Sequence, residues 1–172
     1  MRFYETEISE SDVLTRMSLT SKGYIASTMH RAENVDGRDR LERLLKGMAM
    51  AGEKHQVPIV LSLHPRTADR IKHWGIEPDT SWLQFHTPVG FFDFVQLERN
   101  ALAVITDSGT VQEECCILNT PNVTIRDTTE RPETLECGSN ILAGSEPEAI
   151  LSALNIVLEP NRTWVPPQEY MA

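Results

Sequence analysis

The stretch that decides the fold is ALAVITDSGTVQEECCIL, residues 101–118. It begins with six mostly apolar residues, as expected for a short strand that is buried on both faces of a sheet. A polar turn, Asp107-Ser108-Gly109, follows, and residues 109–118 are expected to form a helix. A buried strand, a turn with glycine and a helix in this order are typical of α/β proteins with a parallel sheet.

The same alternation of strand and helix extends in both directions from this stretch. Further strands are predicted at 23–29, 58–63, 82–86, 122–125 and 140–143. Helices are expected at 38–54, 66–74 and around 91–97. A last helix is expected after Ser145, because Ser145 to Glu148 match a capping box with proline at an early helical position; its apolar face would be Ile150, Leu151, Leu154 and Leu158. Residues 30–37 are expected to be a loop. The chain therefore predicts one Rossmann-like domain at 1–172, with helices on both faces of its sheet, a linker and short helix at 1–22, and a tail at 160–172.

Composition is that of an ordinary globular protein, with 40% hydrophobic and 24% charged residues. No apolar stretch approaches the ~20 residues of a membrane helix, and the acidic N-terminus is unlike a signal peptide. The net charge of -9 argues against nucleic-acid binding. The three cysteines have no metal-like spacing, which indicates buried, reduced thiols in a cytoplasmic protein.

Polar residues follow four of the predicted strands directly. They are His30-Arg31, His64, Asp107 to Gly109, and the charged segment 126–131. In parallel sheets, ligands bind beyond the carboxyl ends of the strands. Four strand ends that carry polar groups to one edge therefore predict a binding site there.

The turn after residues 101–106 has the chemistry of a phosphate site. The unpaired N–H groups at a helix start favour an anion, Gly109 allows close approach, and Ser108 adds a hydroxyl. Capping of the helix by Ser108, or by Thr110 in a capping box, is an equally good interpretation, and both roles can coexist. Of the adjacent Glu113 and Glu114, which point about 100° apart, one can face a ligand and hold a ribose.

The remaining candidates are Arg131 and two histidines. Arg131, stiffened by Pro132, can grip a diphosphate with two hydrogen bonds, although charged loops are usually only solvated. His30 and His64 at neighbouring strand ends are either functional or loop caps. The other three histidines, which have no evident partners, are interpreted as structural: His55, His73 and His86.

Taken together, four segments resemble the non-hydrolysing UDP-N-acetylglucosamine 2-epimerases. They are HRAENVD at 30–36, HPR at 64–66, TDSGTVQEE at 106–114 and RDTTERPE at 126–133, and they follow the order and approximate spacing of that family. The resemblance covers about residues 11–170. It implies the C-terminal half of a GT-B fold, the half that binds UDP.

The resemblance also assigns roles to single residues. Ser108, Gly109 and Thr110 would lie at the diphosphate, with Thr110 where many members have a second glycine, and Glu114 would hold the ribose. The segment from Val89 to Phe94 would flank the uracil, with Phe94 at the stacking position. His30 and Arg131 would neutralise phosphate charge during catalysis. Arg31 and His64 match a second, regulatory UDP-sugar site of bacterial members.

The implied reaction inverts C2 of the sugar, interconverting UDP-N-acetylglucosamine and UDP-N-acetylmannosamine for cell-envelope polysaccharides. UDP is eliminated to give a glycal and then adds back, which needs no metal or nicotinamide cofactor. The family's catalytic carboxylates lie in the N-terminal domain, which this sequence does not contain. We therefore expect this chain to be inactive by itself, with the missing domain or a complementary chain as a partner, and to self-associate through exposed apolar surface.

Four alternatives stay open at this stage. The chain can belong to an epimerase of a modified UDP-sugar, or to a hydrolysing member that releases free N-acetylmannosamine. It can be a module that binds a UDP-sugar without turnover, or a glycosyltransferase domain of the same architecture. The segment 126–133 favours the epimerases over the glycosyltransferases.

Overall fold

The computed structural model describes the backbone of residues 1–172 and every side chain except that of Arg2. One parallel sheet runs through the molecule in the strand order β3-β2-β1-β4-β5-β6. The strands are β1 Ile25–Thr28, β2 Ile59–Ser62, β3 Leu83–His86, β4 Ala103–Thr106, β5 Asn122–Thr124 and β6 Asn140–Leu142. This is the strand order of Rossmann folds, so the predicted α/β architecture is confirmed.

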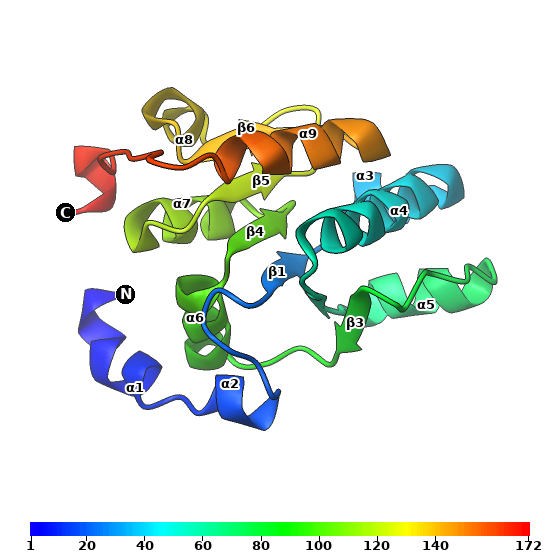
Figure 1. Cartoon of the computed structure of the whole chain (residues 1–172), viewed down its shortest axis with the longest axis horizontal. Helices are drawn as coiled ribbons and strands as arrows, with labels where there is room; N and C mark the ends of the chain where they lie inside the picture. The colour runs from blue at the N-terminus through cyan, green and yellow to red at the C-terminus, as the bar shows by residue number, and fades with distance from the viewer.

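Helices connect the strands and cover both faces of the sheet. The α-helices are α1 Glu5–Ser9, α2 Val13–Arg16, α3 Ala32–Val35, α4 Arg38–His55, α5 Pro65–His73, α6 Phe91–Asn100, α7 Gly109–Leu118, α8 Pro132–Cys137 and α9 Pro147–Val157. Two 3₁₀ turns, η1 Arg2–Tyr4 and η2 Gln168–Tyr170, lie near the two ends of the chain. Figure 1 shows α4 and α9 side by side, with the strands between them and α6.

Two hydrophobic clusters hold these layers together. The larger joins α4 and α9 to the sheet through buried residues that are mostly aliphatic. They include Leu41, Leu44, Leu45 and Met48 of α4 and Ile150 and Leu154 of α9. Gly47 permits the close approach of the two helices, because a Cβ there would lie 2.8 Å from Ile150 Cδ1. The smaller cluster packs α6, α7 and residues 13–19 on the other face.

The register of the sheet brings the four polar strand ends level with one another. Thr28 of β1 pairs with Ser62 of β2 and with Thr106 of β4, and Thr106 pairs with Thr124 of β5. The hydroxyls of Thr28 and Thr106 are 2.7 Å apart. Because the strand order reverses direction between β1 and β4, the edge beyond these two strands is the switch point where such sheets bind ligands.

The structure corrects four local predictions. Residues 32–35, expected in a loop, form the short helix α3. The capping box at Ser145 is absent, since Glu146 is the N-cap of α9 and no side chain caps it. His55 is not without a partner, because its Nε2 lies 2.9 Å from Asn155 Oδ1 and so joins α4 to α9. Cys137 is partly exposed rather than buried, although all three cysteines are free.

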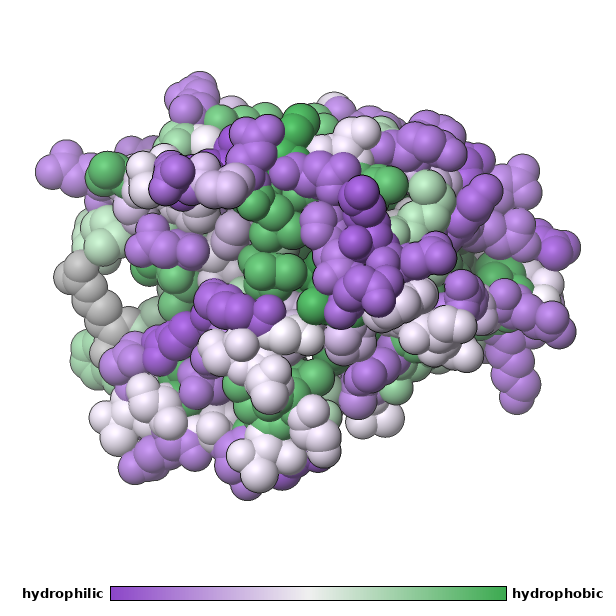
Figure 2. Space-filling view, in the orientation of Figure 1, coloured by the Kyte–Doolittle hydropathy of each residue, from purple (hydrophilic) through white to green (hydrophobic). Residues whose placement is uncertain are grey.

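The surface is mostly polar on the side of α4 and α5. In Figure 2, hydrophilic residues dominate the right of the visible face, and hydrophobic residues show in a band near its middle. Within the part of the chain that the structure describes, no helix combines the length and apolar character needed to cross a bilayer.

Candidate functional site

Asp107, at the end of β4, organises the polar edge of the sheet. Its carboxylate is fully buried and accepts hydrogen bonds from the backbone N–H groups of His30 and Arg31, at 3.0 and 2.9 Å, and from Asn34 Nδ2 at 3.1 Å. Three donors from the loop after β1 and from α3 thus converge on one residue after β4. Asp107 therefore fixes the position of His30 and Arg31 against the start of α7.

The two candidate histidines lie next to each other at this edge. Their ring centroids are 6.0 Å apart, and His30 Nδ1 is 3.4 Å from Asp107 Oδ1. His64 is the N-cap of α5, where its Nδ1 accepts from Arg66 N at 3.1 Å, so this histidine caps the helix that follows it. A cavity of about 100 Å³ lies between them, lined by Thr28, Met29, His30, Ser62, His64 and Pro88.

Ser108 and Gly109 form the start of α7. Ser108 is the N-cap, and its Oγ accepts from Val111 N at 3.5 Å, so one of the two predicted capping schemes is confirmed. Thr110 lies inside the helix and is exposed, so the capping box that begins at Thr110 is wrong. The capping of Ser108 leaves other N–H groups of the first turn available to an anion.

Arg131 lies directly over this helix start. A Cβ on Gly109 would be 3.9 Å from Arg131 Cγ, from Arg131 Cζ and from Glu130 Oε2. The guanidinium forms an ion pair through Nε with Glu113, and its Nη1 donates to the Glu130 carbonyl at 3.1 Å. A diphosphate at the start of α7 would therefore meet a guanidinium that Glu113 already orients.

Glu130 ties the charged segment to the loop after β1. Its carboxylate accepts from Arg126 Nη1 at 2.6 Å and lies 3.7 Å from Arg31 Nη2. The Arg126 guanidinium beside Glu130 holds the pKa of that carboxyl below its usual value. The side chain of Arg126 is nearly buried and also donates to Glu33 at 2.8 Å. These ion pairs fix residues 126–131 on the sheet edge, so the segment is not merely solvated.

Glu114 points away from its neighbour Glu113, as their spacing on the helix predicts. Whereas Glu113 contacts Arg131, the Glu114 carboxyl faces that of Glu98 on α6. Burial raises the pKa of Glu114, and the hydrogen bond from Glu98 acts in the opposite direction. Glu114 is partly buried on the side of α7 that faces α6.

The expected uracil-flanking segment spans the turn before α6 and its first residues. Val89 and Phe94 are partly buried and pack on the smaller hydrophobic cluster, which includes Val111 of α7. Phe91 and Phe92, at the start of α6, are more exposed. The apolar segment thus borders the α7 side of the sheet edge.

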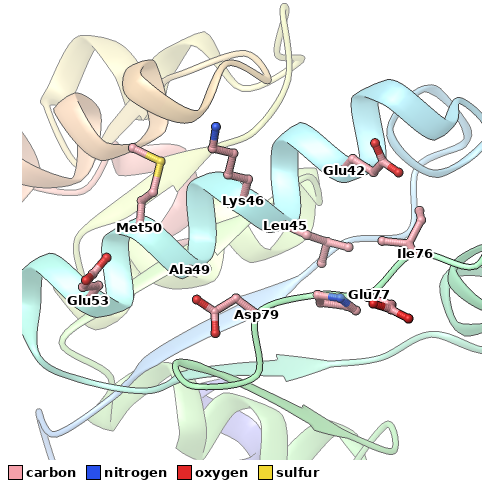
Figure 3. Close-up of a pocket in the computed structure, with 10 residues that line it drawn as sticks. Glu42, Leu45, Lys46, Ala49, Met50, Glu53, Ile76, Glu77 and Asp79 are labelled. Carbon is pink, nitrogen blue, oxygen red and sulfur yellow. The ribbon is translucent and has the colours of Figure 1, made fainter.

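A larger cavity, of about 410 Å³, lies away from this edge. Figure 3 shows it between α4 and the segment that carries Ile76, Glu77 and Asp79, with Glu42 and Glu53 at the two ends of the helix stretch. Its carboxylates outnumber its single ammonium, that of Lys46, so it is a poor place for a phosphate. Among the described side chains, no group of three or more histidines, cysteines and acids is arranged to hold a metal ion.

Comparison with known proteins identifies the family. The family described as UDP-N-acetylglucosamine 2-epimerase matches residues 1–170. The chain belongs to this family. Among curated relatives, the UDP-N-acetylglucosamine 2-epimerase of Methanocaldococcus jannaschii is 43% identical over 147 residues, which are 84% of this chain and 40% of that protein. The enzyme of the same name from Methanococcus maripaludis is 44% identical over 144 residues, 82% of this chain and 39% of that protein.

The chain thus spans about 40% of the length of the curated relatives that it matches. A third relative in the epimerase family is the UDP-2,3-diacetamido-2,3-dideoxy-D-glucuronate 2-epimerase of Pseudomonas aeruginosa, which is 37% identical over 131 residues, or 76% of this chain and 36% of that protein. Solved structures agree. The M. jannaschii epimerase in complex with UDP-GlcNAc and UDP has a TM-score of 0.85 at 37% identity, over 94% of this chain and 46% of that one.

A protein of another family has a similar fold. The E. coli ADP-heptose heptosyltransferase II has a TM-score of 0.63 at 16% identity over 90% of this chain, which shows a shared fold only. Together with the epimerase structures, it confirms the Rossmann-like half of a GT-B fold that the sequence predicts. The epimerase family is confirmed as well.

The structure brings most of the predicted residues to one edge but distributes them over two groups. His30, Arg31 and His64 surround Asp107 and the small cavity, whereas Ser108, Gly109 and Arg131 lie at the start of α7. Sequence reasoning missed two residues of this region. The sequence indicates Asp107 only as part of a polar turn, although its place directly before a helix N-cap is a usable signal. Glu98 gave no sequence signal, because its partner is in another helix.

Proposed function

We propose that this chain is the UDP-binding half of a UDP-N-acetylglucosamine 2-epimerase. The observation that carries the proposal is the guanidinium of Arg131 lying over Gly109 at the N-terminus of α7. A helix start with free N–H groups, a glycine and an arginine above it matches the charge and shape of a diphosphate. The solved complex of the M. jannaschii epimerase with UDP-GlcNAc and UDP supports the same ligand class.

Each residue at the edge then has a role. The diphosphate would lie on the first turn of α7 against Ser108, Gly109 and Thr110, and Glu114 would accept hydrogen bonds from the ribose hydroxyls. The uracil would lie against Val89 and Phe94. His64 lines the neighbouring small cavity, and Arg31 follows His30, another of its lining residues. We propose that Arg31 and His64 contact a second UDP-sugar that regulates the first.

The chemistry of this half concerns the leaving group. A base removes the C2 proton of the sugar, the C1–O bond breaks, and UDP leaves with the electron pair. Arg131 and His30 would stabilise the negative charge that develops on the diphosphate. UDP then adds back to C1 while C2 takes a proton on its other face, which inverts that carbon. The acid and base for C2 would come from a second domain that faces this edge, either on another chain or in a longer protein.

A modified UDP-sugar is the second candidate substrate. It is favoured by the likeness to the P. aeruginosa UDP-2,3-diacetamido-2,3-dideoxy-D-glucuronate 2-epimerase, which is 37% identical over 131 residues. Both candidates share the nucleotide and differ in the groups on the sugar. The residues of this chain that we assign contact the nucleotide, so they serve either substrate.

Calorimetric titration of the chain with UDP tests the proposal. We expect saturable binding that weakens by about tenfold in Ser108→Ala and in Arg131→Ala, since each loses about one hydrogen bond or charged contact. Arg38→Ala is the matched control, because Arg38 is an exposed arginine paired with Glu42 on α4. Absence of binding at millimolar UDP, or equal weakening in all three variants, would contradict the proposed site. Turnover of UDP-GlcNAc or of the diacetamido sugar after addition of a relative's N-terminal domain separates the two substrates.

A further inference from the structure

Glu98 of α6 is an acid in an unusual place. Its side chain is fully buried, and neither carboxyl oxygen has a hydrogen-bond donor among the described residues. Burying an ionised carboxylate without a cation is strongly disfavoured, because the protein interior replaces the water that solvated the charge. Such a group persists only when it holds a proton or meets a partner.

Among the described side chains, no cation pairs with the Glu98 carboxyl, and the Lys22 ammonium donates instead to the backbone carbonyls of Arg99 and Ala101. Thr120 Oγ1 and the Tyr24 hydroxyl use their protons on the backbone carbonyls of Glu98 and Leu97, at 2.9 and 2.5 Å. Arg99, next in the chain, points outward and pairs with Glu5 of α1. From α7, the groups that face Glu98 are the Glu114 carboxyl and the buried Cys115 thiol, both acidic.

The two carboxyls therefore share one proton. Burial first, and the charge of Glu114 second, raise the pKa of Glu98 well above its ordinary value. Glu98 is the more deeply buried of the two, so burial favours the proton on Glu98, which can then donate it to Glu114. Glu114 is partly exposed, so it is the member on which charge costs less.

This arrangement determines what Glu114 can bind. An ionised carboxylate has about four acceptor positions and no donor, whereas a protonated one loses acceptor capacity. One hydrogen bond from Glu98 leaves acceptor positions for two further donors and fixes the plane of the carboxylate. Two hydroxyls on adjacent carbon atoms, as in a ribose, supply two such donors.

We propose that Glu98 is a positioning residue that keeps Glu114 ionised and oriented to accept both hydroxyls of a ribose. The inference rests on the proposed UDP site, since it assigns Glu114 to the ribose. It adds a specificity: the chain selects ribonucleotides over 2′-deoxyribonucleotides through a proton held by a residue that the nucleotide does not touch.

The first test needs no ligand. The infrared spectrum of the folded chain at neutral pH should contain the C=O stretching band of a protonated carboxylic acid. That band should disappear in Glu98→Gln and persist in Glu148→Gln, a control in which an exposed acid of α9 is changed in the same way. A wild-type spectrum without the band, or a band that survives Glu98→Gln, overturns the shared proton.

The second test measures selectivity with UDP and 2′-deoxy-UDP. Wild type should prefer UDP by about tenfold, the value of one lost hydrogen bond to a charged group. Glu98→Gln keeps a donor toward Glu114 and should retain the preference, whereas Glu98→Leu removes the donor and should lose it. A cooperative melting transition of Glu98→Leu should be measured first to establish that this variant folds, and we expect little loss of stability, since replacing buried ionisable groups by apolar residues is often neutral.

The outcomes separate the two proposals. An infrared band together with equal binding of the two nucleotides by wild type contradicts the positioning role and leaves the nucleotide site intact. An infrared band with no binding of UDP refutes the proposed function and, with it, the role of Glu98 in ribose selection. Retention of the preference in Glu98→Leu also overturns the inference.

Discussion

The two faces of the sheet differ in the buried side chains that cover them. On the face of α4 and α9, the buried side chains are almost wholly aliphatic and pack in one large cluster. On the face of α6 and α7, the smaller cluster lies beside a buried acid, a buried tyrosine hydroxyl and a buried thiol, those of Glu98, Tyr24 and Cys115. The first face supplies most of the apolar burial that stabilises the fold, and the second holds polar groups next to the proposed site.

The largest expected effect is the loss of stability when a side chain is removed from the aliphatic face. Leu154→Ala, in α9, removes a fully buried side chain from the large cluster and should cost about 3 kcal/mol of the free energy of unfolding, as measured by urea denaturation. Under conditions where the variant is folded, its affinity for UDP should equal that of wild type. Leu97→Ala, on the other face, should be destabilised comparably but also bind UDP more weakly, because Leu97 adjoins Glu98. Equal affinity in both variants would remove the functional distinction between the faces.

The next prediction concerns pH and the polar face. Burial and Glu114 raise the pKa of Glu98 in the folded protein above the unfolded value of about 4.3. The stability due to Glu98 is therefore fully present below the unfolded pKa and is lost as the pH rises through the folded pKa. Wild type should lose stability with rising pH relative to Glu98→Gln, when both are melted across a pH series. Parallel curves would show that Glu98 is not perturbed.

A smaller effect distinguishes capping from ligand binding at the start of α7. Ser108→Ala removes the N-cap hydrogen bond and should cost about 1 kcal/mol of stability. Gly109→Ala should not destabilise the fold, because the new Cβ meets its nearest neighbours at 3.9 Å, an ordinary contact. It should still weaken UDP binding by about tenfold, since the methyl group occupies the space of a phosphate. Thermal melts and calorimetry of the two variants separate stability from affinity, and unchanged affinity in Gly109→Ala would argue against a phosphate there.

The smallest expected effect concerns the reactivity of the three cysteine thiols, which depends on their burial and not on the stability of the fold. Cys137 is partly exposed, whereas Cys115 and Cys116 are fully buried, and burial raises the pKa of the Cys116 thiol to about 11. An alkylating reagent should modify Cys137 in the native protein and reach the other two only in denaturant. Peptide mass spectrometry identifies the modified residue, and early labelling of Cys115 would indicate that the α6–α7 face opens readily.

The sequence predicted the sheet well because its strands are short apolar runs bounded by polar turns. The start of α7 was predicted for the same reason, with Ser108 and Gly109 directly after a buried strand. Local capping was harder: Ser145 matched a motif, but the helix begins one residue later with Pro147, and Glu146 takes the cap position. Motifs of four residues do not reveal which of two adjacent residues takes the cap.

Contacts between distant segments could not be predicted from local pattern. Asp107 is bonded to residues 73 to 77 positions away, and Glu98 meets Glu114 only because α6 and α7 pack on the same face. The separate directions of Glu113 and Glu114 followed from helix geometry, but their partners Arg131 and Glu98 required the tertiary structure. The position of the candidate site at the carboxyl ends of the strands was therefore predictable, whereas its hydrogen-bonding network was not.

The central pair of strands has a consequence for how the chain acquires its site. β1 and β4 lie side by side although Thr28 and Thr106 are 78 positions apart, whereas each other pair joins strands closer in sequence. Loop closure makes such a distant pairing slow relative to local ones. We expect the strands β1–β3 and the strands β4–β6 to form two units early, and these units to join late through the pairing of β1 with β4. The proposed nucleotide site lies at the ends of β1 and β4. The fluorescence change of a labelled UDP on binding would therefore appear only after the two units have joined, and its rate would report the last step of folding.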